Sequence, residues 1–147
     1  MKQSSAPVNV GNRGFSDRNY AELAAFRMTL RSFLAFSEGA AEKMGLTAQQ
    51  HQAILALRGL APENGATVGD LARYLLLKPH TAGELVDRLV RAKLVVRAPD
   101  PGDGRRTLLI LTPKAKNALE ILSQKHLAEI RRNAPNLIKL LRQLSKE

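Results

Sequence analysis

Apolar residues recur every three or four positions along most of this chain, the spacing that places them on one face of an α-helix. One short region departs from this spacing and has two β-branched, aliphatic runs around a turn rich in Pro and Gly. The sequence therefore predicts a mainly α protein with a small β-hairpin. The expected helices cover residues 17–44, 48–60, 68–75, 79–91, 113–132 and 137–144, and the expected strands cover residues 94–97 and 107–111.

Several predicted helices begin with a recognisable cap. Thr47 and Thr67 are followed three residues later by Gln50 and Asp70, the spacing of a capping box. In that motif, the hydroxyl and the later side chain satisfy free N–H groups of the first helical turn. Pro79 suits the first position of a helix because the N–H that it lacks would have no partner there. These signals fix three helix starts.

The helices over 68–75 and 79–91 are joined by a link of only three residues, which predicts a packed pair. The inward side of the second helix has the i, i+3, i+4, i+7, i+8 spacing and consists of Ala82, Leu85, Val86, Leu89 and Val90. Its outward side is polar and includes His80, Gly83, Glu84, Asp87 and Arg91, and an ion pair between the last two is expected from their i, i+4 spacing. Two short helices with a tight link, the second with a polar outer face, form a helix-turn-helix.

The hairpin follows this pair directly. Its turn, residues 98–106, contains Asp100, Gly102 and Asp103 and leaves Arg105 and Arg106 near the tip. Arginine side chains at such a tip can enter the minor groove of a DNA duplex, where the negative potential is enhanced. On this interpretation Asp103 orients Arg105. The alternative is ordinary Asp-Gly turn chemistry in a solvated hairpin.

Taken in order and spacing, these residues resemble the MarR-type winged-helix regulators. The residues that carry the resemblance are Leu85-Val86-Asp87-Arg88-Leu89, Leu94-Val95-Val96-Arg97, Asp103-Gly104-Arg105 and Leu111-Thr112, with Leu46-Thr47 and Gln50 upstream. The similar layout covers roughly residues 20–145. Two positions depart from the family pattern, because Lys93 and Ala115 stand where glycine is usual. A non-glycine residue at a left-handed helix cap costs up to about 1 kcal/mol, so the angle between helix and wing is expected to differ somewhat.

The resemblance implies a fold class and a domain organisation. The fold is mainly α with a small β-hairpin wing, a winged helix-turn-helix domain plus long N- and C-terminal dimerisation helices. We expect a flexible N-terminal tail over residues 1–15, a helical dimerisation region over 16–45 and 113–147, and the winged helix-turn-helix over 46–112.

The terminal helices are apolar on more than one side, which independently indicates an interface. Five of the six aromatic residues lie between Phe15 and Phe36, consistent with core packing or, as a group, with a dimer seam and a pocket wall. Asn133-Ala134-Pro135 is expected to stop the fifth helix before a short leucine-rich one. The pattern indicates an interface, and the resemblance implies a two-fold homodimer.

Composition narrows the function. The net charge of +10 favours a polyanionic partner, although it also fits a basic soluble surface. The chain has no cysteine, which excludes disulfides and thiol chemistry, and its three histidines form no metal-binding pattern. His51 is expected on the outer side of its helix. No apolar run has the length of a membrane span and residues 1–14 lack a signal core, so we expect a cytoplasmic protein. No catalytic motif or cofactor motif is present, which predicts that the chain is not an enzyme and has no cofactor.

The leading hypothesis is a transcriptional regulator, with repression favoured, that binds a pseudo-palindromic duplex operator as a homodimer. Two recognition helices in successive major grooves would lie about 34 Å apart. Thr81 can contact a thymine methyl group and Glu84 can accept from cytosine, whereas Arg88 is better placed for phosphate. The candidate DNA-binding residues are Lys78, Pro79, His80, Thr81, Gly83, Glu84, Asp87, Arg88, Asp103, Arg105 and Arg106.

Control by a ligand is implied by the resemblance alone, since members of the family are often released from DNA by small phenolic or aromatic carboxylate compounds. Arg27 and Arg31, one turn apart among aromatic residues that include Phe33, are the candidate ligand-binding residues, with inter-helix salt bridges as the alternative use of the arginines. A second hypothesis is a winged-helix protein-interaction module without specific DNA binding. Salt-dependent binding of duplex DNA would distinguish the two.

Overall fold

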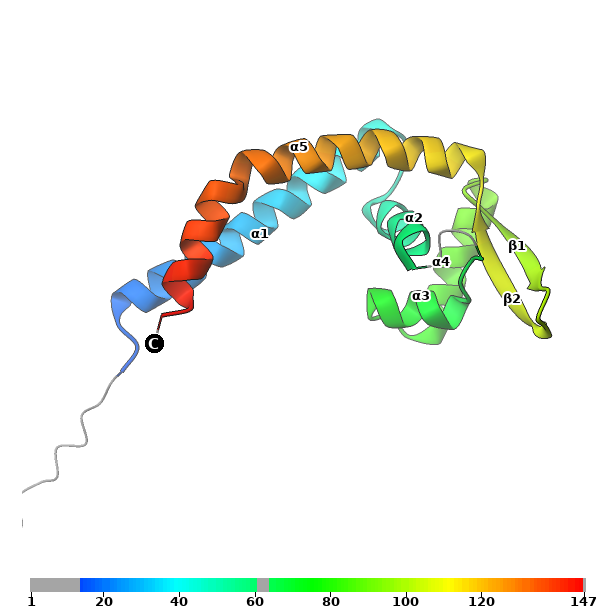
Figure 1. Ribbon diagram of the computed structural model, residues 1–147, viewed down its shortest axis with the longest axis horizontal. Helices are drawn as coiled ribbons and strands as arrows, with labels where there is room; N and C mark the ends of the chain where they lie inside the picture. The colour runs from blue at the N-terminus through cyan, green and yellow to red at the C-terminus, as the bar shows by residue number, and fades with distance from the viewer. Residues whose placement is uncertain (1–13, 61–63, 147) are drawn as a thin grey trace, which may run out of the picture.

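The computed structural model describes residues 14–60 and 64–146 of the chain. Most of the predicted tail, residues 1–13, lies outside the described residues. Figure 1 shows a long two-helix arm joined to a smaller, compact group of elements. The elements in chain order are α1 (Asp17–Lys43), α2 (Ala48–Leu60), α3 (Val68–Leu75), α4 (Pro79–Arg91), β1 (Val95–Asp100), β2 (Asp103–Leu111) and α5 (Pro113–Leu144). The predicted fold class, mainly α with one antiparallel hairpin, is confirmed.

We call α1 and α5 the arm, and α2, α3, α4 and the hairpin the head. The two arm helices lie side by side along much of their length (Figure 1). The chain crosses between arm and head at two short links, Met44 to Thr47 and Thr112. No helix within the described part of the chain is long and apolar enough to cross a membrane.

The helix starts follow the predicted caps. The Gln50 N–H donates to the Thr47 hydroxyl at 3.1 Å, and the Thr47 N–H donates to the Gln50 amide oxygen at 3.0 Å. Thr67 and Asp70 make the same reciprocal pair at 3.1 and 2.9 Å. The Asp70 carboxylate accepts a hydrogen bond from the Thr67 N–H, and this bond lowers the pKa of the Asp70 carboxyl. Both capping boxes predicted from the sequence are therefore present.

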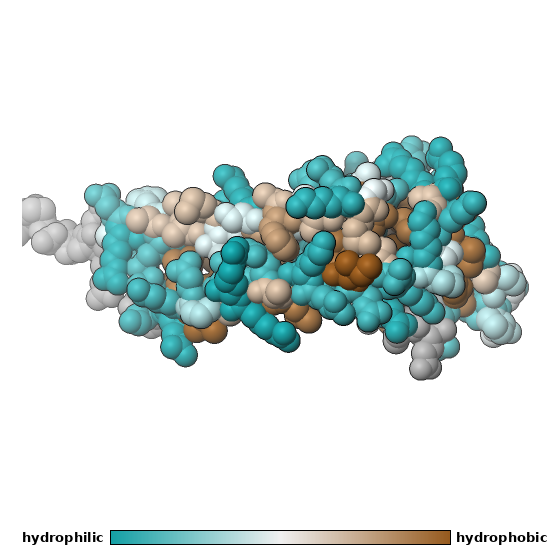
Figure 2. Space-filling model, turned by 90° about the horizontal axis from the view of Figure 1, so that it is seen from above, coloured by the Kyte–Doolittle hydropathy of each residue, from teal (hydrophilic) through white to brown (hydrophobic). Residues whose placement is uncertain are grey.

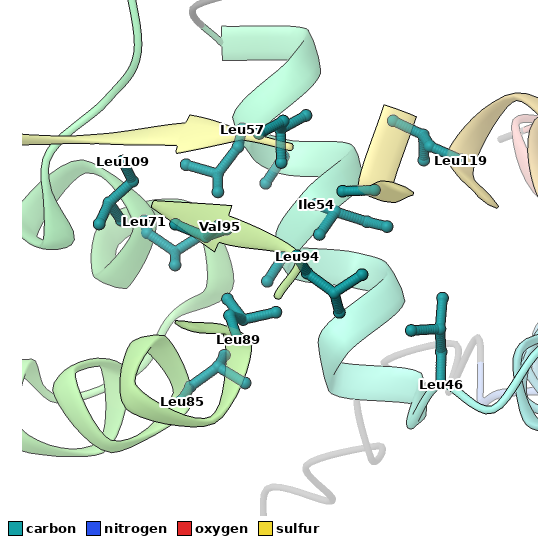
Figure 3. Close-up of a cluster of buried hydrophobic side chains, with 14 of the residues drawn as sticks. Leu46, Ile54, Leu57, Leu71, Leu85, Leu89, Leu94, Val95, Leu109 and Leu119 are labelled. Atoms are coloured by element: carbon teal, nitrogen blue, oxygen red, sulfur yellow. The ribbon is translucent and has the colours of Figure 1, made fainter. Parts of the chain in front are cut away.

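The core of the head lies between α2 and the elements that surround it. Ile54 and Leu57 of α2 meet side chains from α3, α4 and both strands (Figure 3). The largest side chains that the fold buries almost completely are Ile54, Leu71, Leu85, Leu89, Leu94, Leu109, Leu122, Val86 and Val95. Leu122 extends this core into the arm, so one continuous apolar cluster connects head and α5. The outward side of α4 takes no part in it.

The C-terminal prediction of two helices is wrong. Residues 113–144 form one 32-residue helix, with Pro135 inside it. A proline in a helix removes one backbone hydrogen bond and crowds the carbonyl one turn earlier, which bends the helix without requiring it to end. Figure 1 shows α5 curving over its second half, toward Leu144 in red. Leu140, beyond the proline, is buried, so packing keeps this last segment helical.

The hairpin is longer than predicted and its turn is tighter. β1 extends to Asp100 and β2 begins at Asp103, leaving only Pro101 and Gly102 between them. The register shifts at Asp100, where a bulge accommodates the irregular pairing. Pro99 is tolerated because β1 is an edge strand and needs no donor on its outer side. The two arginines expected in the turn therefore lie on β2.

Candidate nucleic-acid interface

The polar side of α4 is exposed, as the helix-turn-helix interpretation requires. The candidates on this element and its cap are exposed, apart from Gly83, which is half-buried; they are Lys78, Pro79, His80, Thr81, Gly83, Glu84, Asp87 and Arg88. Lys78 is the cap residue and makes no side-chain hydrogen bond to the first turn. That turn has no acidic residue, so the partial positive charge at this helix end faces outward and favours a phosphate.

Two side-chain contacts organise this surface. His80 Nε2 lies 3.2 Å from Glu84 Oε1, one turn along α4. Arg97 Nη2 on β1 donates to Asp87 Oδ1 at 2.5 Å, which connects α4 to the hairpin. Arg91 instead donates to the backbone carbonyl of Asp87 at 3.4 Å, so the ion pair expected between Asp87 and Arg91 is not formed. No local sequence signal pairs Arg97 with Asp87, because ten residues and a change of element separate them.

The wing residues are also exposed, and the two aspartates of the turn hold its backbone. Asp100 Oδ1 accepts the Gly102 N–H at 2.9 Å, and Asp103 Oδ1 accepts the Arg105 N–H at 3.0 Å. Asp103 thus positions Arg105 through the main chain. Arg106 Nε lies 3.9 Å from Asp100 Oδ2. Asx-type turn bonds therefore hold this turn and present Arg105 on an exposed strand.

The connection from α4 to the wing runs through Lys93, which has φ +59°. This is the left-handed conformation expected where the family pattern has glycine. The backbone there is held by α5, because the Thr112 hydroxyl donates to the Lys93 carbonyl at 2.7 Å and Lys114 Nζ donates to the Ala92 carbonyl at 3.0 Å. The start of α5 therefore fixes the end of α4 and the root of the wing together.

The ligand-site candidates are separated by the structure. Phe33 lines a cavity of about 560 Å³ between α1 and α5, whereas Arg27 and Arg31 do not line it. The arginine that does line it is Arg132, which donates to Glu129 Oε1 at 2.9 Å. Sequence reasoning missed Arg132 because the pairing of α1 with the distal part of α5 is tertiary. The described residues hold no group of three or more His, Asp or Glu side chains that could bind a metal ion.

His51, expected on the outer side of its helix, is in fact buried, with 4% of its surface exposed. Its ring contacts that of His126 on α5, with ring centroids 4.8 Å apart. Burial, and then the charge of His126, lower the pKa of His51. The signal that could have found this placement is its position three residues before Ile54, which puts both on one helical stripe.

Comparison with known proteins agrees with this geometry. A model of the MarR family matches residues 44–106, from the link after α1 to the wing. The transcriptional activatory protein BadR of Rhodopseudomonas palustris is 38% identical over 85 residues, which are 58% of this chain and 49% of BadR. The match therefore spans about half the length of this curated relative.

Solved structures of similar fold cover more of the chain. A mutant of MepR from S. aureus, bound to an oligodeoxyribonucleotide, is 25% identical with a TM-score of 0.63 and covers 90% of this chain and 100% of its own. A second solved MarR family transcription regulator is 27% identical with a TM-score of 0.69, and the match covers 82% of this chain and 78% of that protein. CouR from Rhodococcus jostii, bound to p-coumaroyl-CoA, shares the fold at 20% identity with a TM-score of 0.71. The match covers 87% of this chain and 92% of CouR. Residues 44–106 of this chain therefore match the MarR family, and solved MarR family transcription regulators share its fold.

Proposed function

We propose that this protein is a cytoplasmic DNA-binding transcription regulator that binds a pseudo-palindromic duplex as a homodimer. The observation that carries the proposal is the exposed polar side of α4 joined to the wing by the Asp87–Arg97 pair. A helix with an exposed polar side can enter a major groove, and an arginine on the adjacent hairpin can reach the minor groove. The MepR mutant bound to an oligodeoxyribonucleotide has the same fold, which supports this assignment.

The proposed contacts follow from position on these two elements. Thr81 and Glu84 are assigned to base edges, and Lys78 and Arg88 to phosphates. Arg105 is assigned to the minor groove, with Arg106 beside it. The basic character of the chain, +10 overall, adds an electrostatic attraction to any duplex that weakens as salt is added.

Exposed apolar side chains on the arm support the homodimer. Only Ala40 and Ala41 of the 27-residue helix α1 are buried. The large apolar side chains that the arm helices expose are Tyr20, Leu23, Met28, Leu30, Leu34, Ile121, Leu127, Ile130, Ile138 and Leu141. Figure 2 shows apolar side chains in brown and tan along the arm between charged ones in teal. Ten large apolar side chains exposed on two paired helices are more than a soluble monomer usually leaves to solvent, so we assign this surface to a second copy of the chain.

Release by a small aromatic or anionic ligand is the regulatory part of the proposal. The cavity of about 560 Å³ has the size of a small-molecule site, and Phe33, Ile130 and Leu137 give it an apolar part. Arg27 and Arg31 lie on the same helix as Phe33 but outside this cavity, so the arginine open to an anionic ligand there is Arg132, which such a ligand would share with Glu129. CouR, bound to p-coumaroyl-CoA, is a protein of this fold with an aromatic acyl ligand.

Repression is the proposed sign of regulation, through an operator that overlaps a promoter. The curated relative BadR is described as an activatory protein, so the sign needs its own measurement. A reporter gene behind the promoter next to this gene, with and without the protein, provides it. Lower expression in the presence of the protein supports repression, and higher expression refutes it.

DNA binding is tested with Arg105→Ala and a matched control. Arg142→Ala removes the same charge from an exposed position at the far end of the arm. At fixed salt, Arg105→Ala is expected to weaken binding of a footprinted duplex by about 1–3 kcal/mol, whereas Arg142→Ala leaves it nearly unchanged. Equal effects of the two variants would remove the wing from the proposal. A wild-type protein that binds no duplex at low salt would refute the function itself.

The dimer is tested with Leu34→Glu, which places a charge in the exposed apolar surface of α1. Sedimentation of the wild-type protein should give twice the mass of one chain, and the variant should shift toward the monomer. Glu42→Gln, an exposed change on the same helix, is the control. A wild-type monomer at micromolar concentration would refute the homodimer.

A further inference from the structure

His51 of α2 stands apart from the rest of the interior. Within residues 14–60 and 64–146, it is the only polar or charged side chain that the fold buries. Its Nδ1 has no hydrogen-bond partner. A buried polar atom without a partner destabilises a fold, and an apolar side chain of similar size would avoid that cost. Packing alone therefore does not explain why a histidine occupies this buried position.

The surroundings of His51 place it at the joint between head and arm. Its ring lies against the ring of His126 on α5, tilted by 37°. His126 Nδ1 lies 2.5 Å from the Leu122 carbonyl, and its Nε2 lies 2.7 Å from the Ser37 hydroxyl on α1. Two aromatic side chains of α1, Phe33 and Phe36, meet the His126 ring edge-on. The two imidazoles thus connect the head to both arm helices.

The two rings differ in their hydrogen bonds. The Leu122 carbonyl can only accept, so Nδ1 of His126 carries the hydrogen and Nε2 accepts from the Ser37 hydroxyl. His51 has no such arrangement, since its buried Nδ1 faces no acceptor. A proton on His51 would therefore be buried without an acceptor, against the ring of His126.

Among the described residues, no carboxylate is paired with either ring to offset a positive charge on His51. On α2, the next ionisable residue after His51 is Arg58, two turns on. Lys43 of α1 and Lys125 of α5 line one shallow cavity of about 260 Å³ together with Phe36, so cations flank the joint. Glu129 of α5 is held by Arg132 at 2.9 Å. The other ionisable groups nearest along α1 are Glu38 and Glu42.

We propose that the His51–His126 contact is a proton-sensitive joint, and that a proton taken up by His51 in mild acid loosens the head from the arm and lowers the affinity for duplex DNA. The effect on DNA rests on the proposed function, because the arm sets where the two α4 helices of a dimer lie. The loosening itself does not depend on that function and can be measured on the free protein.

The direction in which the fold shifts the pKa of His51 decides whether acid strengthens or weakens the joint. The pKa of His51 in the folded state lies below its ordinary value of about 6.5, so an opened or unfolded state binds the proton more tightly. The stability of the joint is therefore complete above about pH 6.5 and is lost as the pH falls through that value toward the lower pKa. Each unit of lowering gives about a tenfold preference of the proton for the open state.

The experiment compares the wild-type chain with His51→Leu, an apolar side chain of similar size that does not titrate. Urea unfolding followed by circular dichroism and the Kd for a labelled duplex at fixed salt are measured at about pH 7.5, 6.5 and 5.5, on both sides of the ordinary histidine pKa. Across this range the wild-type protein is expected to lose both stability and DNA affinity. His51→Leu should lose much less of both. His126→Gln keeps a group able to bond Ser37 and removes the ring that contributes to the lowered pKa of His51, so it should also lose less of both than the wild-type protein.

The outcomes separate the joint from the proposed function. Equal loss of stability in the wild-type protein and both variants overturns the joint. A variant-dependent loss of stability with identical pH dependence of DNA binding overturns the coupling to DNA. If no form binds DNA at any pH but the stabilities still differ as expected, the proposed function fails and the joint stands.

Discussion

Replacing Gly65 by alanine is expected to destabilise the fold by about 2–5 kcal/mol, the sum of a backbone cost and an overpacking cost. Gly65 has φ +76°, and an L-residue in this left-handed region costs about 1–2 kcal/mol. The added Cβ would also lie 2.5 Å from Ile110 Cδ1 and 2.9 Å from the Leu109 carbonyl oxygen. The Ile110 side chain can rotate away, but the Leu109 backbone is bonded to Ala66 at 2.7 Å. Overpacking of this kind adds about 1–3 kcal/mol.

Two other glycines separate these contributions. Gly45, the residue after the α1 cap, has φ +74°, and an added Cβ there would meet no atom within 4 Å, so Gly45→Ala reports the backbone cost alone, about 1–2 kcal/mol. Gly39 lies inside α1 with equally open surroundings and no positive φ. Gly39→Ala should stabilise the protein by about 0.5–1 kcal/mol, because glycine is a poor helix former.

The assay is urea unfolding at a fixed protein concentration, since the stability of a dimer depends on concentration. The expected order of stability is Gly39→Ala, wild type, Gly45→Ala and Gly65→Ala, from highest to lowest. If Gly65→Ala costs no more than Gly45→Ala, the close approach of residue 65 to β2 does not hold and the reasoning is refuted.

Lys93→Gly should raise the unfolding free energy by up to about 1 kcal/mol, because Lys93 has a positive φ, and a loss of stability would contradict this. Thr67→Ala should cost about 1 kcal/mol by removing the cap of α3, measured by thermal unfolding, and no change would exclude the cap as a stabilising contact. Because the pKa of Asp70 is lowered by the Thr67 N–H, its stabilisation is present above about pH 3.9 and is lost as the pH falls through that value toward the pKa in the fold. Unfolding from about pH 5 to about pH 2.5 should therefore show a smaller loss for Asp70→Asn than for the wild-type protein. A double-mutant cycle on Asp87 and Arg97 should give a coupling of about 0.2–1 kcal/mol in stability, and additive effects would show that this exposed pair does not stabilise the fold.

Local signals in the sequence predicted much of this fold. A capping box involves residues only three apart, so Thr47 and Thr67 marked helix starts without knowledge of the tertiary structure. The exposed side of α4 followed from its period alone. Pro135 misled the prediction because a proline costs about 3 kcal/mol in a helix, an amount that the packing of the segment around Leu140 offsets in the folded chain.

The sequence could not show the contacts between residues that lie far apart along the chain. The ring of His126 reaches Ser37, 89 residues earlier, and no local pattern encodes that contact. Arg132 and Phe33 line one cavity only because α1 and the distal part of α5 lie together. The pairing of Arg97 with Asp87 likewise depends on how the hairpin packs on α4. The candidate DNA-binding residues were predictable as an exposed face, whereas their order and orientation depend on these tertiary contacts.

The two short links between arm and head have a mechanical consequence. Any movement of one body against the other must be close to a rotation about the line through Met44–Thr47 and Thr112, since neither link has slack to allow sliding. The tip of the wing lies far from that line in Figure 1. A small rotation at the links would therefore be amplified into a much larger sweep of the hairpin tip than of α2, whose first residues adjoin one link.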